Sequence, residues 1–198
     1  MKNLRDRAKT IESKTSLMPY GIHTNVKIDN IEYNPDENYL DIFLSNQFGQ
    51  VYKDRIFLPN INSSWLKKED GTIDQEALAK EEDIFADKLI QYFLLYMDAN
   101  EVPETLNKSY KEVAGKAYSI LSAEIPKNPD LRVNLKLLPD KTGRYARSPR
   151  YGIYIEKYVE GQPTTLSFTK WEMDKISSVN AEKSIDDPES ESKDISLF

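Results

Sequence analysis

One segment in the last third of the chain interleaves positive charge with aromatic rings. Residues 132–158 hold seven basic residues and only two acidic ones, and no acid lies between Lys141 and Tyr151. Binding a single nucleic-acid strand requires cations for the phosphates and exposed rings on which unpaired bases stack. The residues of this segment that we expect to do so are Arg144, Tyr145, Arg147, Arg150, Tyr151 and Tyr154.

Two predicted strands carry further positive charge on the face opposite their apolar residues. Residues 131–137 alternate Leu or Val with polar residues, a period typical of a half-buried strand. This alternation places Arg132 and Lys136 on the polar face. Residues 51–58 repeat the pattern, and their binding candidates are Lys53, Arg55 and Phe57. If these strands pair, one surface of the sheet combines cations with exposed rings.

Structural interpretations of these residues remain open. Strand faces in water are often charged, and Tyr is a frequent strand residue, so Tyr154 suits core or edge packing as well as stacking. Trp65 stands beside two lysines and suits either stacking on a base or seating a helical segment. We include it among the candidates for DNA binding. Trp171 follows a predicted helix N-cap, and we expect it to be a core anchor.

The composition offers little for catalysis. The absence of Cys excludes a thiolate nucleophile, a disulfide framework and sulfur-ligated zinc. The single His23 is interpreted as a surface or hydrogen-bonded strand residue. A metal-dependent nuclease would need clustered carboxylates, and the only candidates are Asp41, Asp54 and Glu156. We therefore expect no enzyme activity and no cofactor.

The order of predicted elements indicates the fold class. The predicted strands cover residues 22–33 with a bulge near Asp29, 39–44, 51–58, 131–137, 153–155 and 166–168. Helical periodicity occupies the stretch from a capping box at Thr72 to a second helix that ends before Pro126, and a short helix follows a second box at Thr169. A helix between the third and fourth strands is typical of an OB-fold. We predict a mainly β fold with a helical insert (α+β), an OB-fold five-stranded antiparallel barrel.

The chain divides into three predicted regions. A basic N-terminal arm covers residues 1–17, an OB-fold domain covers 18–178 with a helical insert at 65–121, and a disordered acidic tail covers 179–198. A disordered segment cannot bury its own Phe, so an apolar pair after several acids is typical of partner binding. The tail residues expected to meet a partner are Asp186, Asp187, Glu189, Glu191, Asp194, Leu197 and Phe198.

This tail resembles those of cellular and phage single-stranded DNA-binding proteins, in which an acidic segment with a terminal Phe recruits replication and repair enzymes. The body is similar to phage replication single-stranded DNA-binding proteins of the OB-fold type. Residues 19–28 (Pro-Tyr-Gly-Ile-His-Thr-Asn-Val-Lys-Ile) resemble their opening strand motif. Residues 132–137, followed by the Pro-Arg-Tyr of 149–151, resemble their later strand and loop. Leu197 stands where that family often has Pro.

The resemblance implies a non-enzymatic protein that coats and protects single-stranded DNA during phage replication and recombination, with little sequence preference. It also implies replication partners such as a polymerase or a helicase–primase, and a cytoplasmic location in the infected host cell. No apolar run reaches the roughly 18 residues of a membrane span, so we expect no membrane partner. The sequence leaves a homodimer open. The alternative function is a non-catalytic protein-interaction or phage structural module with a basic loop.

The acidic tail gives a first testable prediction. Opposite charges on one chain meet at high effective concentration, so the tail should compete with DNA for the basic face. Removing residues 180–198 should then tighten DNA binding and abolish the recruitment of partner proteins. A DNA titration at fixed salt measures the first effect, and unchanged or weaker affinity would argue against competition.

Overall fold

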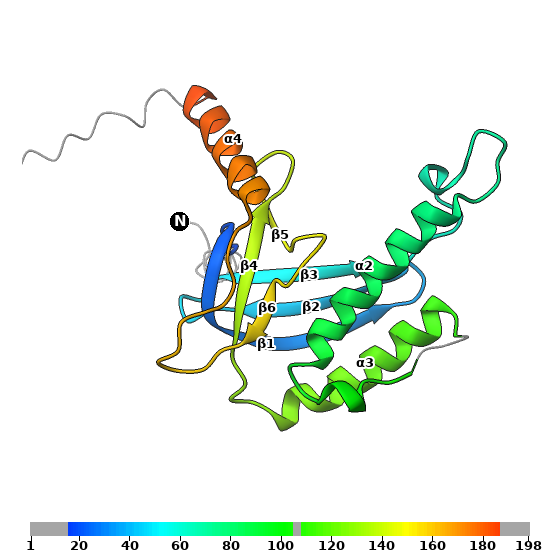
Figure 1. The fold of residues 1–198 in the computed structure, drawn as a ribbon. Coiled ribbons are helices and arrows are strands. Elements are labelled where there is room, and N and C mark those ends of the chain that lie inside the picture. Colours follow the sequence, from blue (N-terminus) through cyan, green and yellow to red (C-terminus); the bar gives the residue numbers. More distant parts are fainter. Residues whose placement is uncertain (1–15, 105–107, 187–198) are drawn as a thin grey trace, which may run out of the picture.

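One long strand, β1 (Gly21–Asn34), connects the two halves of the sheet. The computed structural model describes residues 16–104 and 108–186 (Figure 1). The second half of β1 pairs antiparallel with β2 (Tyr39–Ser45), and its first half pairs antiparallel with β4 (Val133–Pro139). β1 therefore belongs to both halves of the sheet.

The remaining strands extend the sheet on either side of β1. β3 (Val51–Phe57) pairs with β2, while β5 (Ala146–Arg147) and β6 (Ile155–Lys157) both pair with β4. The order is β3-β2-β1-β4-β5, with β6 also on β4. The predicted α+β class with an antiparallel sheet is confirmed, although the sheet has six strands. Since no backbone pairing joins β3 to β5 within the described ranges, the predicted barrel is not closed.

β1 bends where its hydrogen-bond register shifts. One shift lies between Ile28 and Asn30 in the pairing with β2, which confirms the bulge predicted near Asp29. A second shift, around Asn25, occurs in the pairing with β4. Asn25 has a φ of 57°, a left-handed conformation that Asn tolerates better than most residues. Because a bulge bends a strand and increases its twist, β1 can turn from β2 towards β4.

Two helices cover one face of the three-stranded part of the sheet (Figure 1). α2 (Gln75–Phe93) contacts β3, and α3 (Tyr110–Lys127) contacts β1 and β2. Two short 3-10 helices, η1 (Ser64–Leu66) and η2 (Ala99–Glu101), flank α2. The inward side chains of the strands and the apolar stripes of α2 and α3 form one core. On the opposite face of β3, side chains such as Lys53 and Phe57 are exposed to solvent.

Local capping sets the ends of the two insert helices. α2 begins after Asp74, whose side chain accepts hydrogen bonds from backbone N–H groups of the first turn, so the capping box predicted at Thr72 is wrong. α3 begins with a capping box formed by Ser109 and Glu112. It continues through Pro126, before which it was predicted to end.

A last helix, α4 (Lys170–Asp186), lies against β4 (Figure 1). The predicted capping box is confirmed, because the Thr169 N–H donates to the Glu172 carboxylate (2.7 Å) and the Glu172 N–H donates to Thr169 Oγ1 (3.3 Å). α4 is longer than predicted, so residues 179–186 of the predicted tail are helical. The short strand predicted at 166–168 is not formed.

The inward face of β3 places a carboxylate, Asp54, in the core. Its oxygens accept hydrogen bonds from four hydroxyl groups, those of Ser148 (2.6 Å), Tyr92 (2.8 Å), Tyr154 (2.8 Å) and Tyr52 (3.2 Å). The Nζ atom of Lys88 on α2 lies 3.7 Å from the carboxylate. We refer to these six residues as the Asp54 cluster. It connects β3 to α2 and to the segment between β5 and β6.

The Asp54 cluster crosses the gap that backbone pairing leaves between β3 and β5. The Ser148 N–H donates to the Tyr52 hydroxyl (2.7 Å), in addition to the bonds to Asp54. Tyr154 is 0% exposed, its ring packs edge-on against Tyr92, and its hydroxyl group is used by Asp54. The prediction that Tyr154 contacts DNA is therefore wrong.

The electrostatics of the cluster keep Asp54 charged. Burial raises the pKa of this carboxyl, but the charge of Lys88 and the hydrogen bonds from the surrounding hydroxyl groups outweigh burial, and the pKa lies below its ordinary value. A carboxyl whose pKa is lowered by folding stabilises the fold above its unfolded pKa. This contribution is lost as the pH falls through the folded pKa.

Asp54→Asn should lower the free energy of unfolding by about 3–5 kcal/mol at neutral pH, because it leaves the largely buried Lys88 side chain (13% exposed) without its counter-charge. Chemical denaturation measures the loss, and Asp83→Asn on the exposed side of α2 is the matched control. Below a pH of about 4 the wild-type chain should lose stability more steeply than Asp54→Asn. Parallel acid curves would rule out a charged Asp54 as the stabilising group.

Candidate nucleic-acid interface

The solvent side of β3 carries three of the predicted binding residues in a row. Side chains alternate across a strand, so Lys53, Arg55 and Phe57 lie on the face opposite Asp54. Across the strand pair they face residues of β2, with Lys53 opposite Phe43, Arg55 opposite Asp41 and Phe57 opposite Tyr39. Phe57 is 65% exposed. β3 therefore carries its own part of the predicted combination of cations and open rings. The predicted pairing with the strand at 131–137 is wrong, because β2 and β1 lie between β3 and β4.

A second carboxylate organises this row. Asp41 accepts two hydrogen bonds from Arg55, at Nε (2.7 Å) and a terminal nitrogen (2.8 Å), and lies 3.3 Å from Lys53 Nζ. The Arg55 guanidinium also lies 3.5 Å from the centre of the Tyr39 ring. Arg55 is thus held flat against an aromatic ring, and two cations share one anion. The row keeps a positive excess, although Arg55 is not a free phosphate ligand.

Hollows at both ends of β3 are lined by exposed rings. At the start of the strand, Tyr145 from the loop before β5 lines a hollow together with Lys53. At its end, Phe57 and Trp65 line another hollow, and Glu81 of α2 also borders it. Tyr145 is 59% exposed, and Trp65 is exposed to a similar extent. Two ring-lined hollows are therefore separated by the cations of β3.

The end near Trp65 also receives the segment after β5. Arg150 forms an ion pair with Glu81, and its guanidinium lies 6.0 Å from the centre of the exposed Tyr151 ring. The structure thus brings Arg150 to Glu81, which borders the hollow lined by Trp65, although the two segments are distant in sequence. The sequence gives no sign of the role of Glu81, because its position in the helix does not reveal a partner in a distant loop.

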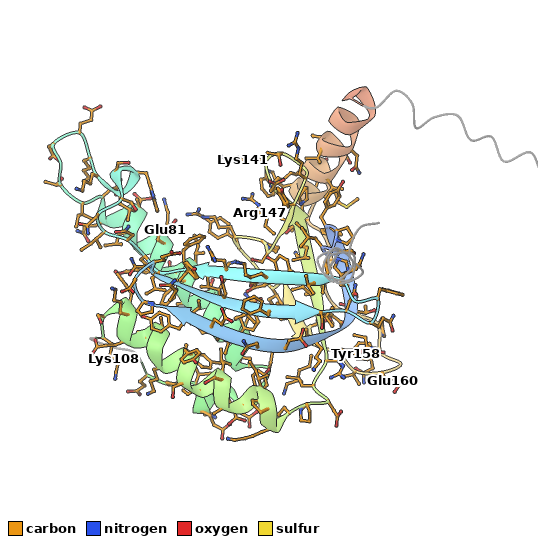
Figure 2. The ribbon with its side chains drawn as sticks, turned by 180° about the vertical axis from the view of Figure 1, so that it is seen from behind. Glu81, Lys108, Lys141, Arg147, Tyr158 and Glu160 are labelled. Atoms are coloured by element: carbon orange, nitrogen blue, oxygen red, sulfur yellow. The ribbon has the colours of Figure 1, made fainter. Side chains whose placement is uncertain are left out.

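The hairpin between β4 and β5 carries the remaining cations. Arg144 and Arg147 are exposed, and no ion pair involves either of them in the part of the chain that the structure describes. Figure 2 shows Lys141 and Arg147 close to the base of α4, with Glu81 towards the other end of the sheet. The loop between β4 and β5, which was predicted to bind DNA because of its charge, therefore presents exposed basic residues next to Tyr145.

Lys136 does not belong to this surface, and its predicted contact with DNA is wrong. It lies on the face of β4 opposite Val133 and Leu135 as the alternation predicted, but it is only 5% exposed. The Lys136 ammonium group donates to the Ser167 carbonyl (3.1 Å) and forms an ion pair with Glu172 of α4 (3.1 Å). Since α4 and the segment before it cover this face, both faces of β4 are buried.

The structure also places Arg132, Trp171 and one of the predicted tail residues. Arg132 is half-buried, and its guanidinium donates to the carbonyl oxygens of Pro129 and Leu131 (2.9 Å each), so it is partly used to close the turn before β4. Trp171 is 67% exposed, and the prediction that it anchors the core is wrong. Of the seven tail residues predicted to bind a partner, Asp186 lies at the end of α4. The other six lie outside the described residues.

The carboxylates considered for a nuclease are dispersed. Asp41 neutralises two cations on the outer face, Asp54 is buried on the inner face, and Glu156 accepts hydrogen bonds from Thr164, Thr165 and Asn134. Burial raises the pKa of Glu156, but these bonds outweigh it and lower the pKa to about 2. In residues 16–104 and 108–180, no group of three His, Cys, Asp or Glu side chains is arranged to hold a metal ion.

Comparison with protein-family models, with curated proteins and with solved structures finds no match to this chain. The function is therefore inferred from the arrangement of the residues themselves. None of the helices described is both long and apolar enough to cross a membrane.

The structural role of the Lys136–Glu172 ion pair can be tested by mutation. Lys136→Met should lower the free energy of unfolding by about 3–5 kcal/mol, because it leaves the Glu172 carboxylate buried without its cation. Adding Glu172→Gln removes the uncompensated charge and should recover much of the loss. Urea denaturation compares the single and double variants. A Lys136→Met chain with unchanged stability and weaker DNA binding would restore the role predicted from the sequence.

Proposed function

We propose that this protein binds single-stranded DNA, without catalysis and with little sequence preference. The observation that carries the proposal is the sequence of groups along β3, from Tyr145 at one end, past Lys53 and Arg55, to Phe57 and Trp65 at the other. Cations that alternate with open aromatic faces are the combination that unpaired nucleotides require. We further propose that the sheet is an open form of the OB-fold, in which the Asp54 cluster replaces the last backbone pairing.

The two kinds of group have separate roles in this proposal. Lys53, Arg144 and Arg147 attract the phosphates, and each neutralised phosphate makes the affinity more dependent on salt. Phe57, Trp65 and Tyr145 offer ring faces to bases, at about 1–3 kcal/mol per stacked base. Because every base has such a face, this mode of binding discriminates little between sequences.

Arg55 serves as part of a platform in this proposal. Its guanidinium is fixed between Asp41 and the Tyr39 ring, and Phe57 packs edge-on against the same ring with a centroid distance of 6.3 Å. A flat guanidinium can itself accept a base in a stack. The platform is preorganised, so less side-chain ordering opposes binding.

The wider setting is proposed from the resemblance described for the sequence. We propose that the protein acts during phage DNA replication and recombination, and that its acidic C-terminal segment recruits replication proteins. α4 continues to Asp186, so removing residues 187–198 tests the tail without shortening the helix. The protein-interaction module remains the competing function, because the same basic hairpin suits an acidic protein surface.

The proposal is tested by titrating the protein with oligo(dT) over a salt series. Phe57→Ala and Tyr145→Ala should each weaken binding about 5- to 150-fold, the equivalent of one lost stacking contact. Lys53→Gln should instead reduce the salt slope by about 0.7, because one phosphate contact is removed. Phe48→Ala, an exposed ring in the turn between β2 and β3, is the control for the aromatic variants.

Two outcomes would overturn the proposal. If oligo(dT) does not bind even at low salt, the basic surface has another partner and the interaction module is favoured. If it binds with a salt dependence but the ring variants match the wild type, the attraction is electrostatic only, and stacking on this face is excluded.

A further inference from the structure

The first turn of α4 is held in a fixed orientation by Glu172. Its carboxylate accepts the Thr169 N–H in the capping box and also pairs with the buried Lys136 of β4. Burial raises the pKa of Glu172, but the Thr169 N–H and Lys136 outweigh it and lower the pKa. One side chain therefore both caps the helix and fastens it to the sheet.

This attachment turns Trp171 towards solvent. Successive residues on a helix point about 100° apart, so a Glu172 that faces β4 directs its neighbour away from the core. Residues four apart share a helix face, and Lys175 lies above the Trp171 ring with its ammonium group 5.8 Å from the centre. The exposed indole and a cation thus form one face of α4.

The basic hairpin lies beside this face. Partial burial lowers the pKa of Lys175, and the neighbouring charges of Arg147 and Lys141 lower it further, with partial compensation from Asp140. Asp140 already accepts hydrogen bonds from the Thr142 hydroxyl group. Among the described residues, no ion pair involves Lys141, Arg147 or Lys175. Three cations are therefore gathered without a matching set of anions, which disfavours the free state and favours a bound polyanion.

The basic hairpin connects the α4 face to β3. Tyr145, in the same hairpin as Lys141 and Arg147, lines the hollow at the start of β3 together with Lys53. Figure 2 places Lys141 and Arg147 close to the base of α4. The hairpin therefore borders β3 through Tyr145 and the α4 face through Lys141 and Arg147.

We propose that Trp171 and Lys175, with Lys141 and Arg147, form a second stacking and phosphate-binding subsite for the same single strand. The inference depends on the proposed function, because the strand must first occupy the β3 row. The subsite takes one unpaired base on the indole, while the adjacent phosphates are neutralised by the three cations. It makes α4 part of the interface rather than a support for the tail.

The chain has two tryptophans, Trp65 and Trp171, which allows each to be observed alone. In Trp65→Phe the only indole is Trp171, and oligo(dT) should quench its fluorescence at the same concentration at which it binds. In Trp171→Phe the remaining indole is Trp65, and its fluorescence reports binding at the end of β3. An abasic deoxyribose-phosphate oligomer of the same length is the second probe, because it carries the charge without a base and should quench far less.

Affinity gives an independent measurement. Trp171→Ala should weaken oligo(dT) binding about 5- to 150-fold with unchanged urea stability, since the ring is not in the core. Lys175→Gln should lower the salt slope by about 0.7. The matched control is Met173→Ala, an exposed apolar residue of the same helical turn, which should leave affinity unchanged.

The outcomes separate this inference from the function on which it depends. If the wild-type chain does not bind oligo(dT) at low salt, the proposed function fails, and the subsite fails with it. If the wild-type chain binds and Phe57→Ala weakens it, while Trp171→Ala binds normally and Trp171 is not quenched, only the subsite is overturned.

Discussion

The bonding of one buried carboxylate is the constraint on which the rest of the structure depends. Asp54 collects four hydroxyl donors and one ammonium group from β3, α2 and the β5–β6 segment. A buried charge is tolerated only when its partners are all in place, so the cluster fixes these elements relative to one another. Side chains thereby connect β3 to the β5–β6 segment, which no backbone pairing joins to β3 in the described residues.

The two faces of β3 divide structure from surface chemistry. Asp54 faces inward and fixes the core, while its neighbours Lys53 and Arg55 face outward. Asp41 plays on the outer face a role like that of Asp54 on the inner one, since it orders cations. The two settings differ in exposure to solvent. The side chain of Lys53 beside Asp41 is 47% exposed, whereas those of Lys88 and Lys136 are 13% and 6% exposed.

Local sequence patterns were most reliable where the interaction is local. The first three strands and the bulge near Asp29 were predicted from alternation and its change of phase, and the Thr169 capping box from a spacing of three residues. The predictions failed where a distant element intervenes. The polar face of β4 was predicted to be open, but α4 covers it and makes Lys136 an internal cation. Tyr154 likewise enters the core because Asp54, 100 residues away, accepts a hydrogen bond from its hydroxyl group.

The sequence by itself determined the α+β class, the alternation that sends Lys53 and Phe57 to one side of β3, and the gathering of basic residues in the β4–β5 hairpin. Each depends on neighbours in the chain, whose spacing is visible in the sequence. Only the tertiary structure decided which cations are consumed by ion pairs and which rings stay exposed. Burial and charge pairing depend on elements that meet only after folding, and Trp171 is exposed because its neighbour, Glu172, is bound to a strand far away in the sequence.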